Sequence, residues 1–316
     1  MEFRSVGGSG LRVSVAGLGC NNFGGRIDEK ETKAVVSAAL DAGITLFDTA
    51  DVYGGTRSEE LLGAALGTRR GDVIVATKFA MPMGDGPYSA GGSRRYVMRA
   101  VEASLRRLGT DYIDLYQMHA PDPTTPIEET LGALDDLVLD GKIRYVGSSN
   151  FFGWQIADAD WTARSRGFSR FVSAQNEWSL LRRAVEREVV PACRHFGASL
   201  LPYFPLAGGA LTGKYRRGEA APAGSRLAGD NGSRWLTDAN FARIEALDAY
   251  AREHGHTVGE LAQAWLASQP VVCSVIAGAT RPEQVRANVA SVEWRLSRDE
   301  LRAVDAALAS AEGALR

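Results

Sequence analysis

The sequence predicts an α/β fold, a (β/α)8 TIM barrel with an N-terminal β-hairpin and extra C-terminal helices. Eight short apolar segments typical of buried strands recur along the chain and alternate with segments of helical periodicity. Such alternation indicates parallel βαβ units, and eight of them suit a closed barrel of ordinary size. No stretch resembles a linker, so we expect a single domain over residues 1–316.

The hairpin comes first, because residues 2–5 and 11–13 flank GGSG, whose glycines allow the positive φ that a tight turn needs. The eight barrel strands are then predicted at residues 15–18, 45–47, 73–77, 113–118, 143–147, 171–174, 200–203 and 273–276. Between the strands, helical spacing is clear in the series Val97, Val101, Leu105, Leu108 and in the series Leu131, Leu134, Leu137, Val138. Residues 186–196 carry a less regular helical pattern.

Three segments are predicted to be additions to the barrel. They are the glycine-rich loop 80–92, the polar stretch 216–233, and a helix pair at residues 238–254 and 297–311. Long loops that follow barrel strands lie at the C-terminal face, where ligands bind.

A doubly wound dinucleotide-binding sheet is the alternative architecture. Its first strand would be followed by GxGxxG, but here the segment is GLGCNNFGG, and its glycine spacing does not match. No acidic residue ends the next strand in the way that fold requires, so this alternative is rejected.

The overall composition excludes several classes of partner. The chain has 316 residues, 45% of them hydrophobic and 23% charged, and its formal net charge of −2 gives no case for binding nucleic acid or an anionic membrane. The three cysteines are far apart and form no CxxC, which favours a reducing compartment. No signal-like segment begins the chain and no apolar run reaches membrane length, so we expect a cytoplasmic protein. His254 and His256 lack partners at ligand spacing, so no metal is expected.

Candidate chemistry lies where polar residues follow the predicted strands. Asp48 and Tyr53 follow the second strand, Lys78 the third and His119 the fourth. Singly, each is explained more simply as a turn, packing or surface residue, although a lysine after an apolar strand must be exposed or paired. Consecutive barrel strands would deliver all four to one rim. Asp51, in contrast, is expected to be a solvent-facing turn residue.

Together these groups have the parts of a proton donor for carbonyl reduction. A nearby ammonium lowers the pKa of a tyrosine, and a carboxylate keeps that ammonium charged. An imidazole can donate a hydrogen bond to a carbonyl oxygen that gains negative charge in the transition state.

The sequence resembles the aldo-keto reductases, a family of NADPH-dependent barrel enzymes, from the hairpin to the last helices. The matching segments are GLGCNNFGG, FDTADVYGG with SEELLG, VATKF, SLRRLGTDYIDLYQMHAPD, GKIRYVGSSNF, AQNEWSLL, YFPLAGGALTGKY and AGATRPEQVRAN. The resemblance implies that Tyr53 is the general acid, that Lys78 paired with Asp48 tunes it, and that His119 orients the carbonyl.

The resemblance also implies a set of NADP(H)-binding residues. Ser149, Asn150 and Gln175 would bind the nicotinamide carboxamide, Tyr203 would stack on the ring, and the backbone around Leu206, Gly208 and Leu211, with Lys214, would hold the pyrophosphate. Gly278, Thr280 and Arg281 would meet the adenosine 2′-phosphate, with Gln284 and Asn288 near the adenine; Gly19, Cys20 and Asp48 complete the cofactor site. One departure from the family is Phe204, where a serine is usual.

The preference for NADP(H) also has a physical basis. Pro282 suits a first helical turn, so a phosphate would meet helix N–H groups and the guanidinium of Arg281. Without the family resemblance, Arg281 is explained more simply as a solvated arginine at the start of a helix.

Two other functions are compatible with parts of the sequence. Some members of this family are auxiliary subunits of potassium channels; the chain begins directly at the hairpin, which favours the enzyme. Gly208–Lys214 resembles a phosphate-binding P-loop, but Tyr215 stands where a magnesium-binding hydroxyl is needed.

The small-molecule carbonyl substrate is not specified by these motifs, and neither is the oligomeric state. Candidate aromatic or flexible residues for its pocket are Phe23, Met81, Tyr88, Trp154, Trp178 and Trp235.

Overall fold

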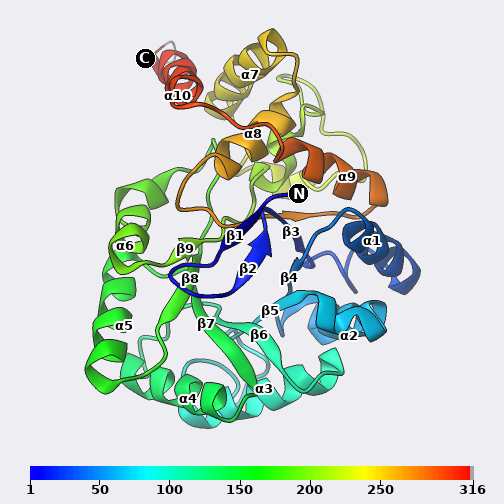
Figure 1. The fold of residues 1–316 in the computed structure, drawn as a ribbon. Helices are drawn as coiled ribbons and strands as arrows, with labels where there is room; N and C mark the ends of the chain where they lie inside the picture. Colours follow the sequence, from blue (N-terminus) through cyan, green and yellow to red (C-terminus); the bar gives the residue numbers. More distant parts are fainter. Residues whose placement is uncertain (314–316) are drawn as a thin grey trace.

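The computed structural model describes residues 1–313, apart from the side chains of residues 230, 231, 312 and 313, and contains an eight-stranded parallel barrel surrounded by helices (Figure 1). The strand order is β10-β3-β4-β5-β6-β7-β8-β9. The strands are β3 (Ala16–Gly19), β4 (Leu46–Asp48), β5 (Ile74–Phe79), β6 (Ile113–Met118), β7 (Ile143–Ser149), β8 (Phe171–Gln175), β9 (Ser199–Leu200) and β10 (Val275–Gly278). The predicted fold class is confirmed.

The barrel closes between β9 and β10. Leu200 bridges to Val272 in parallel, and the Ile276 N–H donates to the carbonyl of Pro202 at 3.2 Å. Strand β9 has two residues where four were predicted, because Pro202 has no N–H to donate to a strand ladder. Strand β10 begins two residues later than predicted, at Val275, which pairs with Ala16.

The helices form the outer layer. They are α1 (Glu29–Asp41), α2 (Arg57–Leu66), α3 (Arg94–Leu108), α4 (Ile127–Leu139), α5 (Gly153–Arg166), α6 (Val189–Phe196), α7 (Asp238–Glu253), α8 (Val258–Ala267), α9 (Pro282–Ser291) and α10 (Arg298–Gly313). Short 3₁₀ helices are η1 (Tyr53–Thr56), η2 (Gly67–Asp72), η3 (Ala184–Arg187), η4 (Ala207–Thr212) and η5 (Gly229–Gly232). The predicted extra helix pair is confirmed, since α7 packs against α10. The irregular pattern at 186–196 is resolved into η3 and a short α6.

The N-terminal hairpin closes one end of the barrel. Strands β1 (Phe3–Ser5) and β2 (Arg12–Ser14) pair in antiparallel fashion. Val6, Leu11 and Val13 are buried in one cluster with residues that point into the barrel. A Cβ at Gly7, whose φ is +56°, would lie 2.4 Å from the carbonyl oxygen of Val172, so this turn requires glycine.

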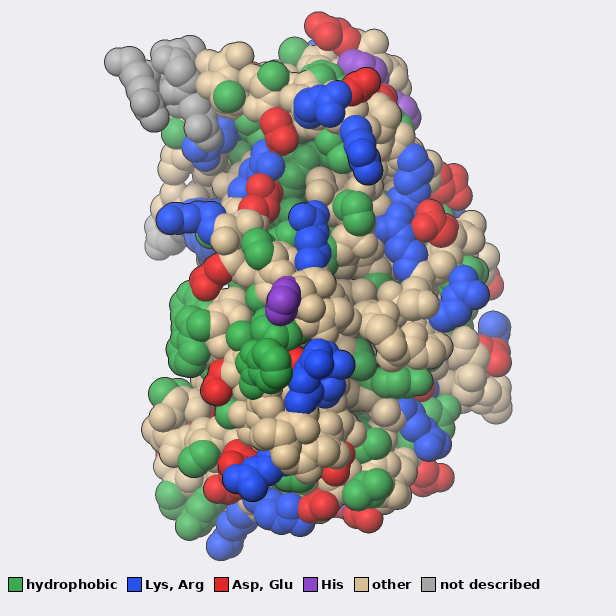
Figure 2. All heavy atoms as spheres, turned by 60° about the vertical axis from the view of Figure 1, so that its left-hand side comes forward, with side chains coloured by type: hydrophobic (Ala, Val, Ile, Leu, Met, Phe, Trp, Pro, Cys, Tyr) green, Lys and Arg blue, Asp and Glu red, His purple; other side chains and the backbone are tan. Residues whose placement is uncertain are grey.

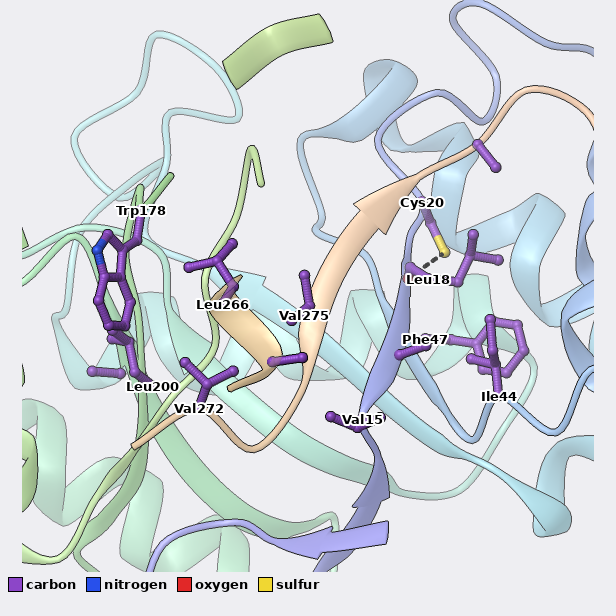
Figure 3. Close-up of a cluster of buried hydrophobic side chains, with 14 of the residues drawn as sticks. Val15, Leu18, Cys20, Ile44, Phe47, Trp178, Leu200, Leu266, Val272 and Val275 are labelled. Atoms are coloured by element: carbon purple, nitrogen blue, oxygen red, sulfur yellow. Dashed lines mark hydrogen bonds between the residues drawn. The ribbon is translucent and has the colours of Figure 1, made fainter. Parts of the chain in front are cut away.

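Alternation along the strands divides the core into two layers. Leu46, Ala76 and Leu115 belong to the inner cluster with the hairpin, whereas their sequence neighbours Phe47 and Tyr116 belong to the outer cluster beneath the helices. Figure 3 shows part of the outer cluster: Trp178, Leu200, Leu266 and Val272 lie on one side of β10, and Leu18, Phe47 and Ile44 lie on the other side, beyond β3. Within the described residues, no helix combines the length and the apolar character that crossing a bilayer requires.

Candidate active site

The inner face of the barrel becomes polar at the C-terminal ends of its strands. Two residues beyond Leu46, Ala76 and Leu115, the same alternation points Asp48, Lys78 and Gln117 into the barrel. The strand register sets Lys78 beside Gln117 and Asp48 beside Ala76.

Asp48 and Lys78 form a buried ion pair. The Lys78 ammonium donates to Asp48 Oδ2 at 2.7 Å and to the carbonyl of Thr49 at 2.8 Å. Burial alone would lower the pKa of Lys78, but the Asp48 carboxylate and Tyr53 outweigh it, so the pKa is raised and the lysine stays charged. Asp48 Oδ1 accepts from Gln175 at 2.8 Å and from Gln117 at 3.2 Å.

Gln117 was not found by sequence reasoning. The available signal was its inward position one residue before the end of β6, two residues before His119. Gln175, predicted as a cofactor residue, uses its amide N–H to hold Asp48 and leaves its oxygen for another donor.

Tyr53 reaches the same site from a strained turn. Gly54, Gly55 and Thr56 all have positive φ, and a Cβ at Gly54 would lie 2.5 Å from the carbonyl of Phe23. The Lys78 ammonium lies 5.1 Å from the Tyr53 ring centroid. Burial raises the pKa of Tyr53, and Lys78 lowers it as expected but by less. The expected effect of the ammonium is present, but burial outweighs it and the pKa of Tyr53 is raised overall.

His119 lies against Tyr53 in an edge-to-face arrangement, with 5.7 Å between the ring centroids. Burial and the Lys78 charge lower the pKa of His119 to about 3, so its imidazole is neutral at physiological pH. The buried Nδ1 has no hydrogen-bond partner among the described residues. The amide of Asn150 donates to the His119 carbonyl at 2.9 Å, which ties the following loop to the site.

A cavity of about 1240 Å³ opens beside these four residues. Asp48, Tyr53 and His119 line it, together with the predicted cofactor residues Gly19, Cys20, Ser149, Asn150, Gln175, Tyr203, Leu206, Gly208, Lys214, Gly278, Thr280, Arg281, Gln284 and Asn288. The exception is Leu211, which is fully buried in the hydrophobic core and whose N–H already donates to the Leu206 carbonyl.

Tyr203 presents its ring to the cavity in a fixed orientation. Its hydroxyl donates to Asn150 Oδ1 at 2.8 Å, and its ring meets that of Phe204 edge to face at 5.2 Å. Phe204 has a positive φ of 54° and lies 5.1 Å from the Arg226 guanidinium. The unusual phenylalanine therefore supports an arginine of the polar 216–233 stretch.

The cavity is suited to an anionic occupant. Arg26, Lys214, Arg226 and Arg281 line it, and among the residues that the structure describes none of the four has a carboxylate in salt-bridge contact. Burial and the nearby Arg26 lower the pKa of Arg226, as expected for a cation without an anionic partner. An aromatic platform with unpaired cations fits a dinucleotide better than a neutral ligand. Arg26 and Arg226 were missed because nothing local separates them from other loop arginines.

Several sequence expectations for this region are wrong. Asp51 is not a solvent-facing residue but is 1% exposed. The six residues proposed for the substrate pocket do not line the cavity: Phe23, Trp178 and Trp235 are buried in the core, and Trp154 is exposed on α5. Local sequence does not distinguish a core aromatic residue from one that lines a pocket.

One face of the molecule carries charges of both signs. Figure 2 shows acidic and basic side chains interspersed over one face of the molecule, without a broad region of one sign. This arrangement agrees with the near-neutral formal charge of −2.

Comparisons with known proteins place these features in context. Residues 16–309 match the model of the aldo/keto reductase family. A probable voltage-gated potassium channel subunit beta of Oryza sativa subsp. japonica is 39% identical over 93% of this chain and 92% of its own length. Versiconal hemiacetal acetate reductase of Aspergillus parasiticus is 34% identical over 96% and 95%. L-glyceraldehyde 3-phosphate reductase of Escherichia coli (strain K12) is 33% identical over 99% and 94%.

Proposed function

The chain belongs to the aldo/keto reductase family of oxidoreductases, and we propose that it reduces an aldehyde or ketone with NADPH while Tyr53 gives the proton. The proposal rests on one observation. Tyr53 and His119 line a cavity next to the buried Lys78–Asp48 pair, and the same cavity is lined by basic side chains that have no carboxylate in salt-bridge contact among the described residues.

The protein groups have complementary tasks in this reaction. Lys78, kept charged by Asp48, favours the phenolate that Tyr53 becomes when its proton leaves for the carbonyl oxygen. Neutral His119 can donate a hydrogen bond to the same oxygen without competing as an acid. Gln117 and Gln175 hold the Asp48 carboxylate, so the ion pair cannot rotate out of place.

We propose NADP(H) as the cofactor, which supplies the hydride when bound. Tyr203 would support one face of its nicotinamide ring, and Lys214 and Arg226 are suited to its pyrophosphate. Arg281, immediately before Pro282 at the start of α9, is suited to a 2′-phosphate.

The experiment is NADPH consumption against a panel of aldehydes, ketones, quinones and steroids, with wild-type protein and Tyr53→Phe. The variant should lose about 10²- to 10⁴-fold in kcat, the usual contribution of a positioned general acid, while its Kd for NADPH stays within about twofold. Retention of near wild-type kcat by the variant would refute Tyr53 as proton donor.

A cofactor-binding auxiliary subunit is the second candidate, favoured by the 39% identity to a probable potassium channel subunit beta. An intact catalytic set does not separate the two functions. Tight NADPH binding without turnover on the panel, together with capture of a membrane channel, would reverse the order of the candidates.

A further inference from the structure

Helix α5 exposes two tryptophans on one side. Trp154 is 63% exposed and Trp161 is 61% exposed, although indole rings are usually buried. The two residues are seven positions apart, close to two helical turns, so both rings lie on the same side of the helix. Asp158, which is also exposed, lies between them on that side. Exposed aromatic residues gathered in this way mark an interaction surface.

Helices α5 and α6 lie next to each other on the flank of the barrel that Figure 2 turns forward. Two contacts set their register. Gly153 N–H, at the start of α5, donates to Glu188 Oε2 at 3.2 Å, and the rings of Trp161 and Phe196 meet edge to face at 6.3 Å. Both contacts join residues that are 35 positions apart, so the helices run parallel and in register along their length.

This register places an acid and a base at the same height. Asp158 of α5 stands beside Cys193 of α6, and the exposed Arg194 follows one residue, about 1.5 Å, further along. Neither charged side chain has a hydrogen bond or an ion pair with any described residue, whereas Arg164 on the same helix is held by Asp160 at 2.6 Å. The two helices therefore present one unpaired carboxylate and one unpaired guanidinium, about one helix spacing apart.

We propose that this chain forms a two-fold symmetric dimer through this surface, here called the α5/α6 face and made of Trp154, Asp158, Trp161, Pro191, Arg194 and Phe196. A two-fold axis that passes between Asp158 and Arg194 exchanges the places of the two helices. It brings Asp158 of each copy against Arg194 of the other, so both charges are paired when two copies meet. A dimer that paired α5 with α5 would instead set Asp158 against its own copy, and the like charges would repel.

The same axis also matches apolar side chains across the dimer. Trp161 lies three residues after the acid, and the exposed Pro191 lies three residues before the base, so Trp161 of each copy covers Pro191 of the other. Trp154 lies four residues before the acid, which places it over the end of α6 in the other copy, beside the partly exposed Phe196. Charge and apolar surface are thus complementary under a single symmetry operation.

The dimer leaves the catalytic cavity open, because no residue of the α5/α6 face lines it. The inference therefore goes beyond the proposed function, and its test needs no turnover. Two helices of this length cover a face of roughly 20 by 20 Å, at the small end of specific interfaces. We expect a dimer whose Kd lies in the micromolar range, about 1–100 µM.

Sedimentation velocity from about 1 µM to about 200 µM tests the proposal. Wild-type protein should pass from monomer to dimer over this range. Asp158→Arg and Arg194→Asp should each raise Kd at least about tenfold, because each variant sets like charges against each other. An equimolar mixture of the two variants should dimerise again, since every contact then joins a carboxylate to a guanidinium. Asp41→Arg, at the exposed aspartate that ends α1, is the matched control and should leave Kd unchanged.

The aromatic part of the face has a test of its own. Trp154→Ala should raise Kd at least about tenfold, the usual effect of removing an aromatic anchor from an interface. Tyr88→Ala, at an exposed tyrosine of the loop 80–92, is the control and should not change association.

Each outcome decides the inference. Wild-type protein that stays monomeric at about 200 µM would overturn it, as would a dimer that neither charge reversal weakens. If both single variants are monomeric and their mixture is monomeric too, Asp158 and Arg194 do not meet across a two-fold axis and the proposal fails. Circular dichroism verifies that the variants fold; should Asp158→Arg not fold, Asp158→Lys takes its place in the mixture.

Discussion

The buried pair of Asp48 and Lys78 allows a quantitative test of the site, through the variant Asp48→Asn. The Lys78 side chain is 0% exposed and that of Asp48 4%, and the Nζ–Oδ2 distance is 2.7 Å. The substitution removes the negative charge. It also replaces a carboxylate oxygen by an amide NH2 group, a donor, in a place where Gln117 and Gln175 already donate hydrogen bonds. Breaking one partner of a buried pair costs about 3–5 kcal/mol in unfolding free energy.

The loss of stability in Asp48→Asn should also depend on pH, in a direction that follows from the pKa of Lys78. In wild-type protein the pKa of Lys78 is raised, so the stabilisation is present below the unfolded lysine pKa of about 10.4 and is lost only as pH rises through the higher folded value. In Asp48→Asn, the carboxylate no longer opposes burial, the largest of the influences on Lys78, so we expect the pKa of Lys78 to fall below its unfolded value. The deficit of the variant should therefore shrink as pH rises from 7 toward 10.

Urea denaturation at pH 7 and pH 9.5 measures both effects, and the midpoint at pH 7 should fall by about 1 M or more. The exposed Asp41→Asn is the control and should change stability by less than about 0.5 kcal/mol. A loss below about 1 kcal/mol at pH 7, or a deficit that does not vary with pH, would refute the account of a charged buried pair.

Two further predictions concern the turn after Tyr53 and the cofactor. Thr56 is β-branched and has a φ of 84°, a strained conformation for such a residue. Thr56→Gly should therefore raise the unfolding free energy by up to about 1 kcal/mol in urea titrations, whereas Thr68→Gly, at an exposed threonine, should not. Destabilisation by Thr56→Gly would contradict strain at Thr56. Arg281→Ala should raise KM for NADPH by roughly 10- to 100-fold and leave KM for NADH nearly unchanged, and equal losses with both would contradict a 2′-phosphate contact.

Local pattern was sufficient to predict the barrel, and it also indicated where the catalytic candidates lie. The alternation of side chains and the predicted strand ends placed Asp48, Lys78 and His119 at one rim of the barrel. This inference does not depend on the helices, because parallel strands all end on the same face of a barrel. The length of β9 was predicted less well. The sequence pattern indicated an extended strand, but Pro202 has no N–H to donate to the strand ladder, so the strand ends before it.

Features that depend on packing between distant elements were missed. The sequence around Asp51 predicted a turn residue exposed to solvent. In the structure it is covered by groups from α2, α3 and β6, which are distant from it in the sequence. The pocket candidates fail for the same reason: Trp178 packs edge to face on Trp265 of α8, with 5.3 Å between the ring centroids, and is a core residue. The net pKa of Tyr53 also depends on how deeply the loop is buried, which a list of neighbouring charges does not give.

Strand β5 contributes neighbouring residues to an inner and an outer charge cluster. Lys78 points inward to Asp48, and Thr77, its neighbour, points outward to Glu59. The inner cluster is balanced, with one ammonium and one carboxylate, while the outer cluster has one guanidinium for Glu59 and Asp51. Burial, followed by the charge of Glu59, raises the pKa of Asp51 in this outer cluster to about 7. The strand therefore separates a compensated ion pair on the cavity side from a carboxyl that has no hydrogen-bond partner among the described residues on the outer side.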